Sequence, residues 1–130
     1  MQKMLLTLTV LLADAANASE DRYICPVHPD GGEWKLVSAV WIPDTAVSTD
    51  ASNYRTISLK RSSTTFGSLT TNSSGGAAFV EGTPQAFTLT ASGTDQEFTA
   101  NTDALEIDST YTGTGAAAAG RVVVCFERMS

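Results

Sequence analysis

The chain alternates short apolar segments with polar turns, and a mainly apolar run that holds both tryptophans covers residues 34–42. Gly31-Gly32 precedes this run and Pro43-Asp44 follows it. Its aromatic and β-branched residues favour a strand over a helix at this length. Regular alternation would divide its apolar residues into two faces: Trp34, Leu36, Val40 and Ile42 on one, and Val37, Ala39 and Trp41 on the other. The pattern therefore predicts a strand that is covered on both sides or lies beside a subunit interface.

Other segments carry the two-residue period of strands with one buried face. Residues 54–61 alternate Ile57 and Leu59 with polar side chains, and residues 85–91 alternate Phe87 and Leu89 with threonines. Further strands are predicted over 22–27, 65–70, 77–80, 96–100, 104–111 and 121–128. We expect the 22–27 strand at an edge because of its prolines. The last strand is apolar on both faces in its middle and is expected to be central.

Two interpretations compete at the N-terminus. Residues 1–18 have the basic start, apolar run and small residues of a secretory signal. Within this segment, however, Leu6, Leu8 and Val10 alternate with Thr7 and Thr9, which is typical of a half-buried strand. We interpret residues 3–12 as a structural strand that is available for inter-subunit pairing. The run is too short for a transmembrane helix.

These elements amount to eight or nine strands with turn signals between them and no convincing helix; residues 113–120 are interpreted as a loop. Such a pattern predicts an all-β, jelly-roll-like sandwich. A length of 130 residues suits one domain, 1–130.

Composition and charge reduce the number of fold and function classes that the chain can belong to. The chain holds 18 Thr and 13 Ser but only 3 Lys, which suits an all-β protein. Its formal net charge of -6 disfavours nucleic-acid binding, because an acidic surface repels phosphates.

Few side chains suggest chemistry. His28, the single histidine, follows Cys25 at a spacing that would supply half a metal site, but no second pair completes it. Glu106 and Asp108 share a strand face, with Asp103 nearby, so a calcium site or an acid–base pair is conceivable. We interpret them as solvated charges, and predict no catalytic, cofactor-binding or metal residue. Cys25 and Cys125 are interpreted as free thiols, with a single bridge as the alternative.

Tryptophans on an open face would favour a sugar-binding platform. Trp34 and Trp41 lie inside the most apolar run, so we expect them in the core or at a subunit contact. We therefore expect the protein to be a scaffold or a binding module without enzymatic activity.

The order of features resembles the small jelly-roll structural proteins of tailed bacteriophages, of the capsid decoration or cement type. The segments that carry this resemblance are Gly31–Val37, Trp41–Asp44, Asn53–Leu59, Asp103–Asp108 and Arg121–Val124. The resemblance implies a non-enzymatic virion protein, made in the host cytoplasm, that stabilises the phage head. It would bind the outer surface of the major capsid protein shell, often as a homotrimer.

Two alternatives stay open. One is a phage head-fibre or tail component. The other is a secreted carbohydrate-binding or adhesin-like β-sandwich module, which the signal-like N-terminus and the tryptophans would suit.

Overall fold

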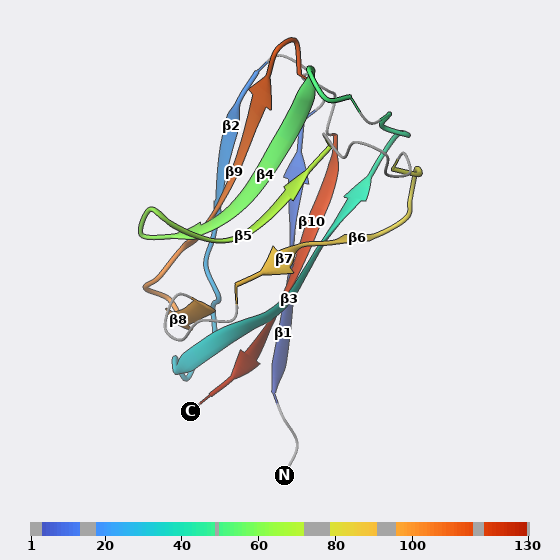
Figure 1. Cartoon of the computed structure of the whole chain (residues 1–130). Helices are drawn as coiled ribbons and strands as arrows, with labels where there is room; N and C mark the ends of the chain where they lie inside the picture. Colours follow the sequence, from blue (N-terminus) through green and yellow to red (C-terminus); the bar gives the residue numbers. More distant parts are fainter. Residues whose placement is uncertain are drawn as a thin grey trace.

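The computed structural model of the chain describes residues 4–13, 18–48, 50–71, 79–90, 96–115 and 119–129. Within these ranges it contains ten strands and no helix (Figure 1). The strands are β1 (Leu5–Leu12), β2 (Glu20–Ile24), β3 (Glu33–Pro43), β4 (Tyr54–Arg61), β5 (Thr64–Thr70), β6 (Gln85–Ala86), β7 (Thr88–Leu89), β8 (Glu97–Thr99), β9 (Leu105–Thr112) and β10 (Gly120–Arg128). The predicted strand over 77–80 and the predicted loop over 113–120 lie partly outside the described residues.

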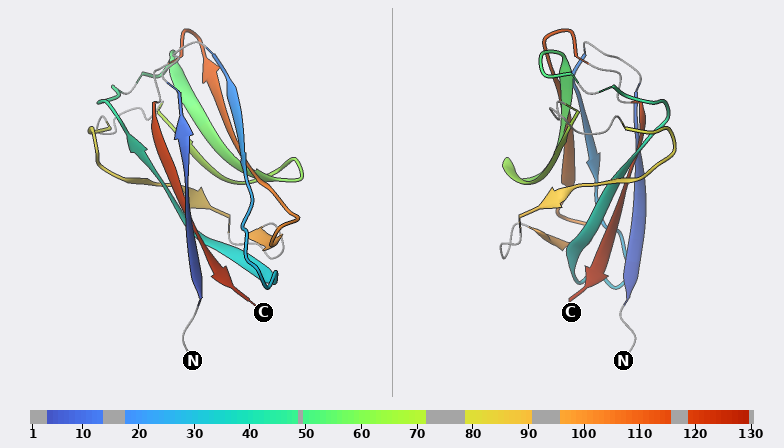
Figure 2. Two further views of the ribbon diagram at one scale, coloured as in Figure 1. Left: turned by 180° about the vertical axis from the view of Figure 1, so that it is seen from behind. Right: turned by 45° about the vertical axis from the view of Figure 1, so that its right-hand side comes forward.

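Two antiparallel sheets face each other as a sandwich, which confirms the predicted fold class (Figure 2). The first sheet has the order β1-β10-β3-β6, with β8 also paired to β3, and we call it the β10 sheet after its central strand. The second has the order β2-β9-β4-β5-β7 and is called the β9 sheet.

The pairing is nested along the chain. β1 pairs with β10, β2 with β9, β3 with β8 and β4 with β5. A long antiparallel ribbon wrapped around a core gives this arrangement, and it is the topology of a jelly roll. The first and last strands are therefore neighbours, so β1 is an integral part of the sheet. β1 confirms the strand predicted at the N-terminus.

Strand β3 departs from the predicted alternation. Cys125 of β10 lies opposite Ser38, but the next residue, Phe126, lies opposite Leu36. Val37 is thus an extra residue without a partner, a β-bulge that shifts the side-chain phase by one position. Trp34 and Leu36 before the bulge and Ala39 and Trp41 after it all face the core.

The prediction that β3 is covered on both faces within the sandwich is wrong. Its second face, which includes Lys35, Val37 and Ser38, is exposed to solvent. The other expected explanation, a subunit interface, stays a prediction.

The single strand predicted over 85–91 is replaced by two short strands in different sheets, within the described residues 85–90. β6 pairs with β3, while β7 pairs with β5 of the opposite sheet. Between them, Phe87 is buried and donates its backbone N–H to the carbonyl of Ala39, at 3.0 Å. The chain thus crosses from one sheet to the other here. β2 is also shifted from the predicted 22–27, because its pairing with β9 covers Glu20–Ile24; it does lie at an edge of its sheet.

The core lies between the sheets and is rich in aromatic side chains. Phe98 stacks edge-on against both Phe66 and Phe126, with ring centroids 6.1 Å and 5.4 Å apart. Trp41 makes a similar contact with Phe79 at 5.5 Å. Offset and edge-to-face pairs of this kind add to the free energy gained by burial.

One charged side chain also lies in the interior. Arg55 of β4 is buried, and its guanidinium donates to the carbonyl oxygen of Ala18 at 2.9 Å and to Ser109 Oγ at 3.1 Å. Burial lowers the pKa of Arg55. These bonds tie the chain entering β2 to the β9 sheet, so Arg55 has a structural role.

Candidate functional site

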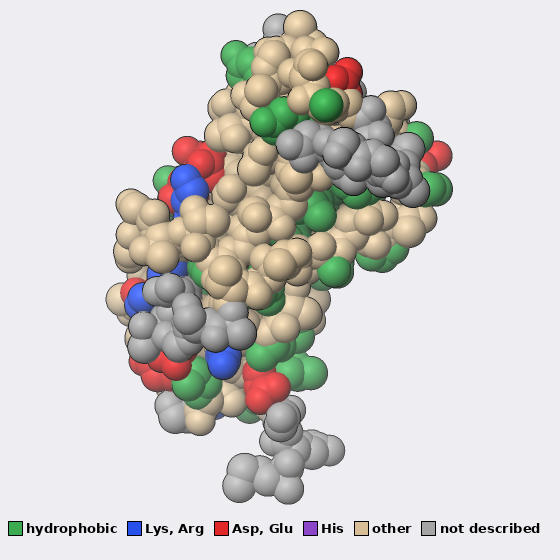
Figure 3. Space-filling view, viewed as in Figure 1, with side chains coloured by type: hydrophobic (Ala, Val, Ile, Leu, Met, Phe, Trp, Pro, Cys, Tyr) green, Lys and Arg blue, Asp and Glu red, His purple; other side chains and the backbone are tan. Residues whose placement is uncertain are grey.

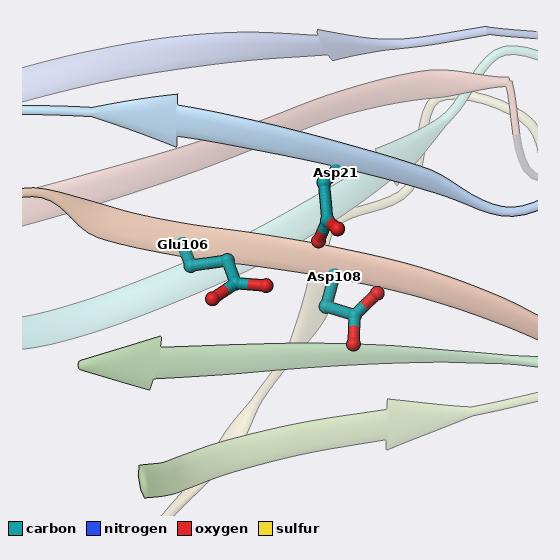
Figure 4. Close-up of side chains that lie close together, drawn as sticks. All are labelled: Asp21, Glu106 and Asp108. Carbon is teal, nitrogen blue, oxygen red and sulfur yellow. The ribbon is translucent and has the colours of Figure 1, made fainter. Parts of the chain in front are cut away.

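Three carboxylates gather on the outer face of the β9 sheet (Figure 4). Glu106 and Asp108 alternate along β9 with the buried Leu105 and Ile107, so both point outward, as predicted. Asp21 of β2 lies opposite Asp108 and joins them. One carboxylate oxygen from each of the three residues lies within 4.8 Å of the others. The sequence alone did not reveal Asp21, because Asp21 lies beside β9 only through the pairing of β2 with β9.

Asp103, the third carboxylate considered with Glu106 and Asp108, lies elsewhere. Its Oδ2 accepts the backbone N–H of Thr99 at 2.9 Å and a hydrogen bond from Arg61 at 3.2 Å. These interactions, the Thr99 bond first, lower the pKa of Asp103. Asp103 therefore fixes the turn between β8 and β9.

A lysine neutralises part of the negative charge of the cluster formed by Asp21, Glu106 and Asp108. Lys60 of β4 places its Nζ 2.7 Å from Asp108 Oδ2. That hydrogen bond raises the pKa of Lys60. The hydrogen bond between Glu106 and Asp21, followed by burial and the charge of Asp21, raises the pKa of Glu106. The charge of Glu106 in turn raises the pKa of Tyr23 beside it.

This arrangement fits a solvated salt-bridge cluster better than a metal centre. Calcium needs six to eight oxygen ligands. The cluster offers three carboxylates, and the Lys60 ammonium already lies against one of them. Figure 3 shows acidic and basic side chains side by side along the left-hand side of the molecule.

His28 is engaged in the turn that precedes β3. Its Nδ1 accepts the backbone N–H of Asp30 at 3.2 Å, and its carbonyl accepts from the Asn101 side chain at 2.9 Å. Its ring lies 5.5 Å from that of Trp34. His28 thus fastens the turn to the core. Cys25 and Cys125 are free thiols.

Both tryptophans are inaccessible to solvent, at 0% exposure. The aromatic platform considered from the sequence therefore does not form from Trp34 or Trp41. Their predicted place in the core is confirmed.

The outer face of the β10 sheet is largely uncharged. Its rows run across β1, β10 and β3, and the two middle rows are Thr7–Cys125–Ser38 and Thr9–Val123–Val40. The outer rows are Leu5–Glu127–Lys35 and Leu11–Arg121–Ile42. Leu5, Leu11 and Val37 are 58%, 66% and 42% exposed. Sequence reasoning assigned a buried face to β1 but did not single out the two leucines on its other face.

The two outer faces of the sandwich therefore differ in chemistry. The β9 sheet carries the carboxylates with Lys60, and the β10 sheet carries apolar and hydroxyl side chains between a few charges at its ends. A face of exposed aliphatic residues is typical of a contact with another protein.

Within the described ranges, no helix has the length and apolar character that crossing a membrane requires. Comparison with known proteins gives no further assignment: no family model matches the chain, and neither a curated protein nor a solved structure matches it.

Proposed function

We propose that this chain is a non-enzymatic structural protein of a bacteriophage virion, a capsid decoration (cement) protein that binds the outer surface of the major capsid protein shell. The observation that carries the proposal is the largely uncharged outer face of the β10 sheet, whose few charges lie in its outer rows. Val40 and Val123 lie at its centre, and Leu5 and Leu11 lie along its edge. A protein that remains docked on a large surface covers such a face, whereas a free monomer exposes it to water.

The jelly-roll topology supports the proposal because it is the fold that the resemblance implies. It also gives a rigid frame: the outer-face residues belong to strands, and strand positions are held more precisely than loop positions. A decoration protein binds through many weak contacts repeated over a symmetric shell, so a flat sheet face suits it better than a pocket.

The acidic face has a role in this account. A net charge of -6 keeps the free protein soluble and away from nucleic acid. With the β10 sheet against the shell, the carboxylates of the β9 sheet point outward into solvent. We thus assign the shell contact to the β10 sheet.

The secreted carbohydrate-binding alternative retains one specific observation. Tyr23 is 65% exposed and lies opposite Glu106, so an aromatic ring and a carboxylate are adjacent on the β9 sheet. A ring beside hydrogen-bond acceptors is a common way to bind sugars. Under this alternative the binding face is the β9 sheet, and Tyr23→Ala would abolish glycan binding.

The test is co-sedimentation of the purified protein with shells assembled from the major capsid protein of the same genome. We expect saturable binding at a fixed number of copies per shell, and shells that withstand a higher temperature when decorated. Absence from the shell pellet, together with glycan binding that Tyr23→Ala removes, would replace the proposal with the alternative.

A further inference from the structure

Strand β1 forms an open edge of the β10 sheet. In the part of the chain that the structure describes, β10 is the only strand with which it pairs. It runs for eight residues, LLTLTVLL, without a charge, a proline or a bulge. Edge strands present unpaired backbone N–H and C=O groups, and proteins usually protect them with one of these devices. β1 therefore offers a template for another strand.

The other sheet edges are protected. β2 carries the consecutive charges Glu20, Asp21 and Arg22, with Arg22 paired to Glu20 at 3.0 Å. At the opposite edges, β6, β7 and β8 are only two or three residues long. Among the described edge strands, β1 alone is therefore long, apolar and unprotected.

We propose that β1 pairs antiparallel with β1 of a second copy of this chain, around a two-fold axis at Leu8. The strand is nearly palindromic about this residue. The opposed pairs would be Leu5 with Leu11, Leu6 with Val10, and Thr7 with Thr9. This inference goes beyond the proposed function and does not depend on it.

The register matches the faces of the two strands. Leu5, Thr7, Thr9 and Leu11 all lie on the outer face, and Leu6, Leu8 and Val10 pack against the core. Because each proposed pair joins residues of the same face, the joined sheet keeps one apolar inner side across the axis. The two most exposed leucines would cover each other.

Charge is compatible with a second copy as the occupant. On β10, Leu5 lies opposite Glu127 and Leu11 lies opposite Arg121. The two-fold axis puts Glu127 of one copy in the same row as Arg121 of the other, at both ends of the contact. The two side chains are three strand spacings apart, about 14 Å, so solvent ions screen most of their attraction. The arrangement nevertheless brings no like charges together across the isologous contact.

The first test is the solution mass by light scattering coupled to size exclusion. We expect twice the chain mass of 13.7 kDa. Leu11→Lys should weaken the dimer at least tenfold, because it places an edge-protecting lysine at the contact. Val27→Lys is the matched control, since Val27 is 65% exposed outside the strands and Leu11 is 66% exposed. A monomeric or trimeric wild type, or a dimer that Leu11→Lys leaves intact, would overturn the proposal; a trimer would agree with the resemblance instead.

A second test fixes the register. In a Cys25→Ser, Cys125→Ser background, Leu5→Cys and Leu11→Cys are prepared as separate proteins. Opposed residues of antiparallel strands have Cα atoms about 4.5–5.5 Å apart, within reach of a disulfide. We expect mild oxidation to give a covalent dimer in the mixture, because the cysteine at position 5 of one copy then lies opposite the cysteine at position 11 of the other. Either protein alone should give little covalent dimer, because its two identical cysteines lie six residues out of register. Equal cross-linking of the separate proteins, or none in the mixture, would contradict the proposed axis.

Discussion

Leu36 and Ala39 both face the core although three positions separate them in one strand, because Val37 is inserted as a bulge between them. An unbroken strand would direct two such residues to opposite faces. The bulge therefore lets one strand bury Trp34 and Trp41 in the same core. It also leaves Val40 and Ile42 on the outer face.

Deletion of Val37 tests this relationship. Removing the extra residue restores regular alternation and forces one half of β3 to turn its core side chains outward. We expect a loss of more than about 3 kcal/mol in the free energy of unfolding, beyond an ordinary substitution. Val37→Thr, which keeps the residue count at a position that is 42% exposed, should stay within about 0.5 kcal/mol. Urea unfolding measures both, and a deletion that is no worse than the substitution would refute the role of the bulge.

Much of this fold follows from the sequence. The period of two at Leu6, Leu8 and Val10 predicts β1 with its buried face, and the apolar character of residues 121–128 predicts a central strand. The phase of β3 could not be predicted, because the bulge depends on where β10 pairs. The division of residues 85–89 between the two sheets likewise depends on strand pairing, which the local pattern does not show.

The candidate site was also predictable only in part. That Glu106 and Asp108 share a face is a local property, and the sequence predicts it. Asp21 and Lys60 reach them only through the pairing of β2 and β4 with β9. The largely uncharged outer face of the β10 sheet could not be recognised before the strand order was known, since its rows combine residues from three strands.

Trp41→Ala should lower the free energy of unfolding by about 3–5 kcal/mol. The side chain is completely buried, and its ring contacts Phe79 edge-on. Trp41→Phe keeps part of that packing and should cost less. Chemical denaturation compares the two variants; a Trp41→Ala protein with wild-type heat resistance would contradict the central place given to this strand.

Gly120→Ala should destabilise the start of β10. A Cβ at this position would collide with the carbonyl oxygen of Ile42 and lie 3.0 Å from Trp41 Nε1. The carbonyl belongs to the backbone of β3 and cannot move aside cheaply, so we expect a cost of about 2 kcal/mol or more.

Gly67→Ala is the matched control for that substitution. The nearest atom to its new Cβ would be the end of the Leu89 side chain, at 2.8 Å, which can rotate away. We expect less than about 1 kcal/mol there. Equal losses in the free energy of unfolding at the two glycines would argue against the close approach of β10 to β3.

Glu106→Gln tests the carboxylate cluster through its pH dependence. The folded chain raises the pKa of Glu106 above the ordinary value of 4.5, mainly through its hydrogen bond with Asp21. In the window above 4.5 the folded state binds more protons than the unfolded state, so stability falls as the pH rises through the folded pKa. The penalty persists at neutral pH, and glutamine removes it.

We therefore expect Glu106→Gln to raise the melting temperature at about pH 7 and to lose that advantage progressively as the pH falls below about 4, where glutamate becomes mostly protonated in both states. Glu81→Gln, at an exposed turn residue, serves as the control for the loss of one negative charge. The same gain in both variants at neutral pH would assign the effect to net charge instead of the cluster.

The most direct measurement of the central claim is the number of copies bound per capsid shell for the wild type, Val123→Lys and Ser58→Lys. Val123 lies at the centre of the outer face of the β10 sheet, and Ser58 lies on the β9 sheet opposite Asp108. The account predicts saturating binding for the wild type and Ser58→Lys, and little for Val123→Lys although it stays folded. Shells that bind none of the three proteins, or that bind Val123→Lys as well as the wild type, would contradict it.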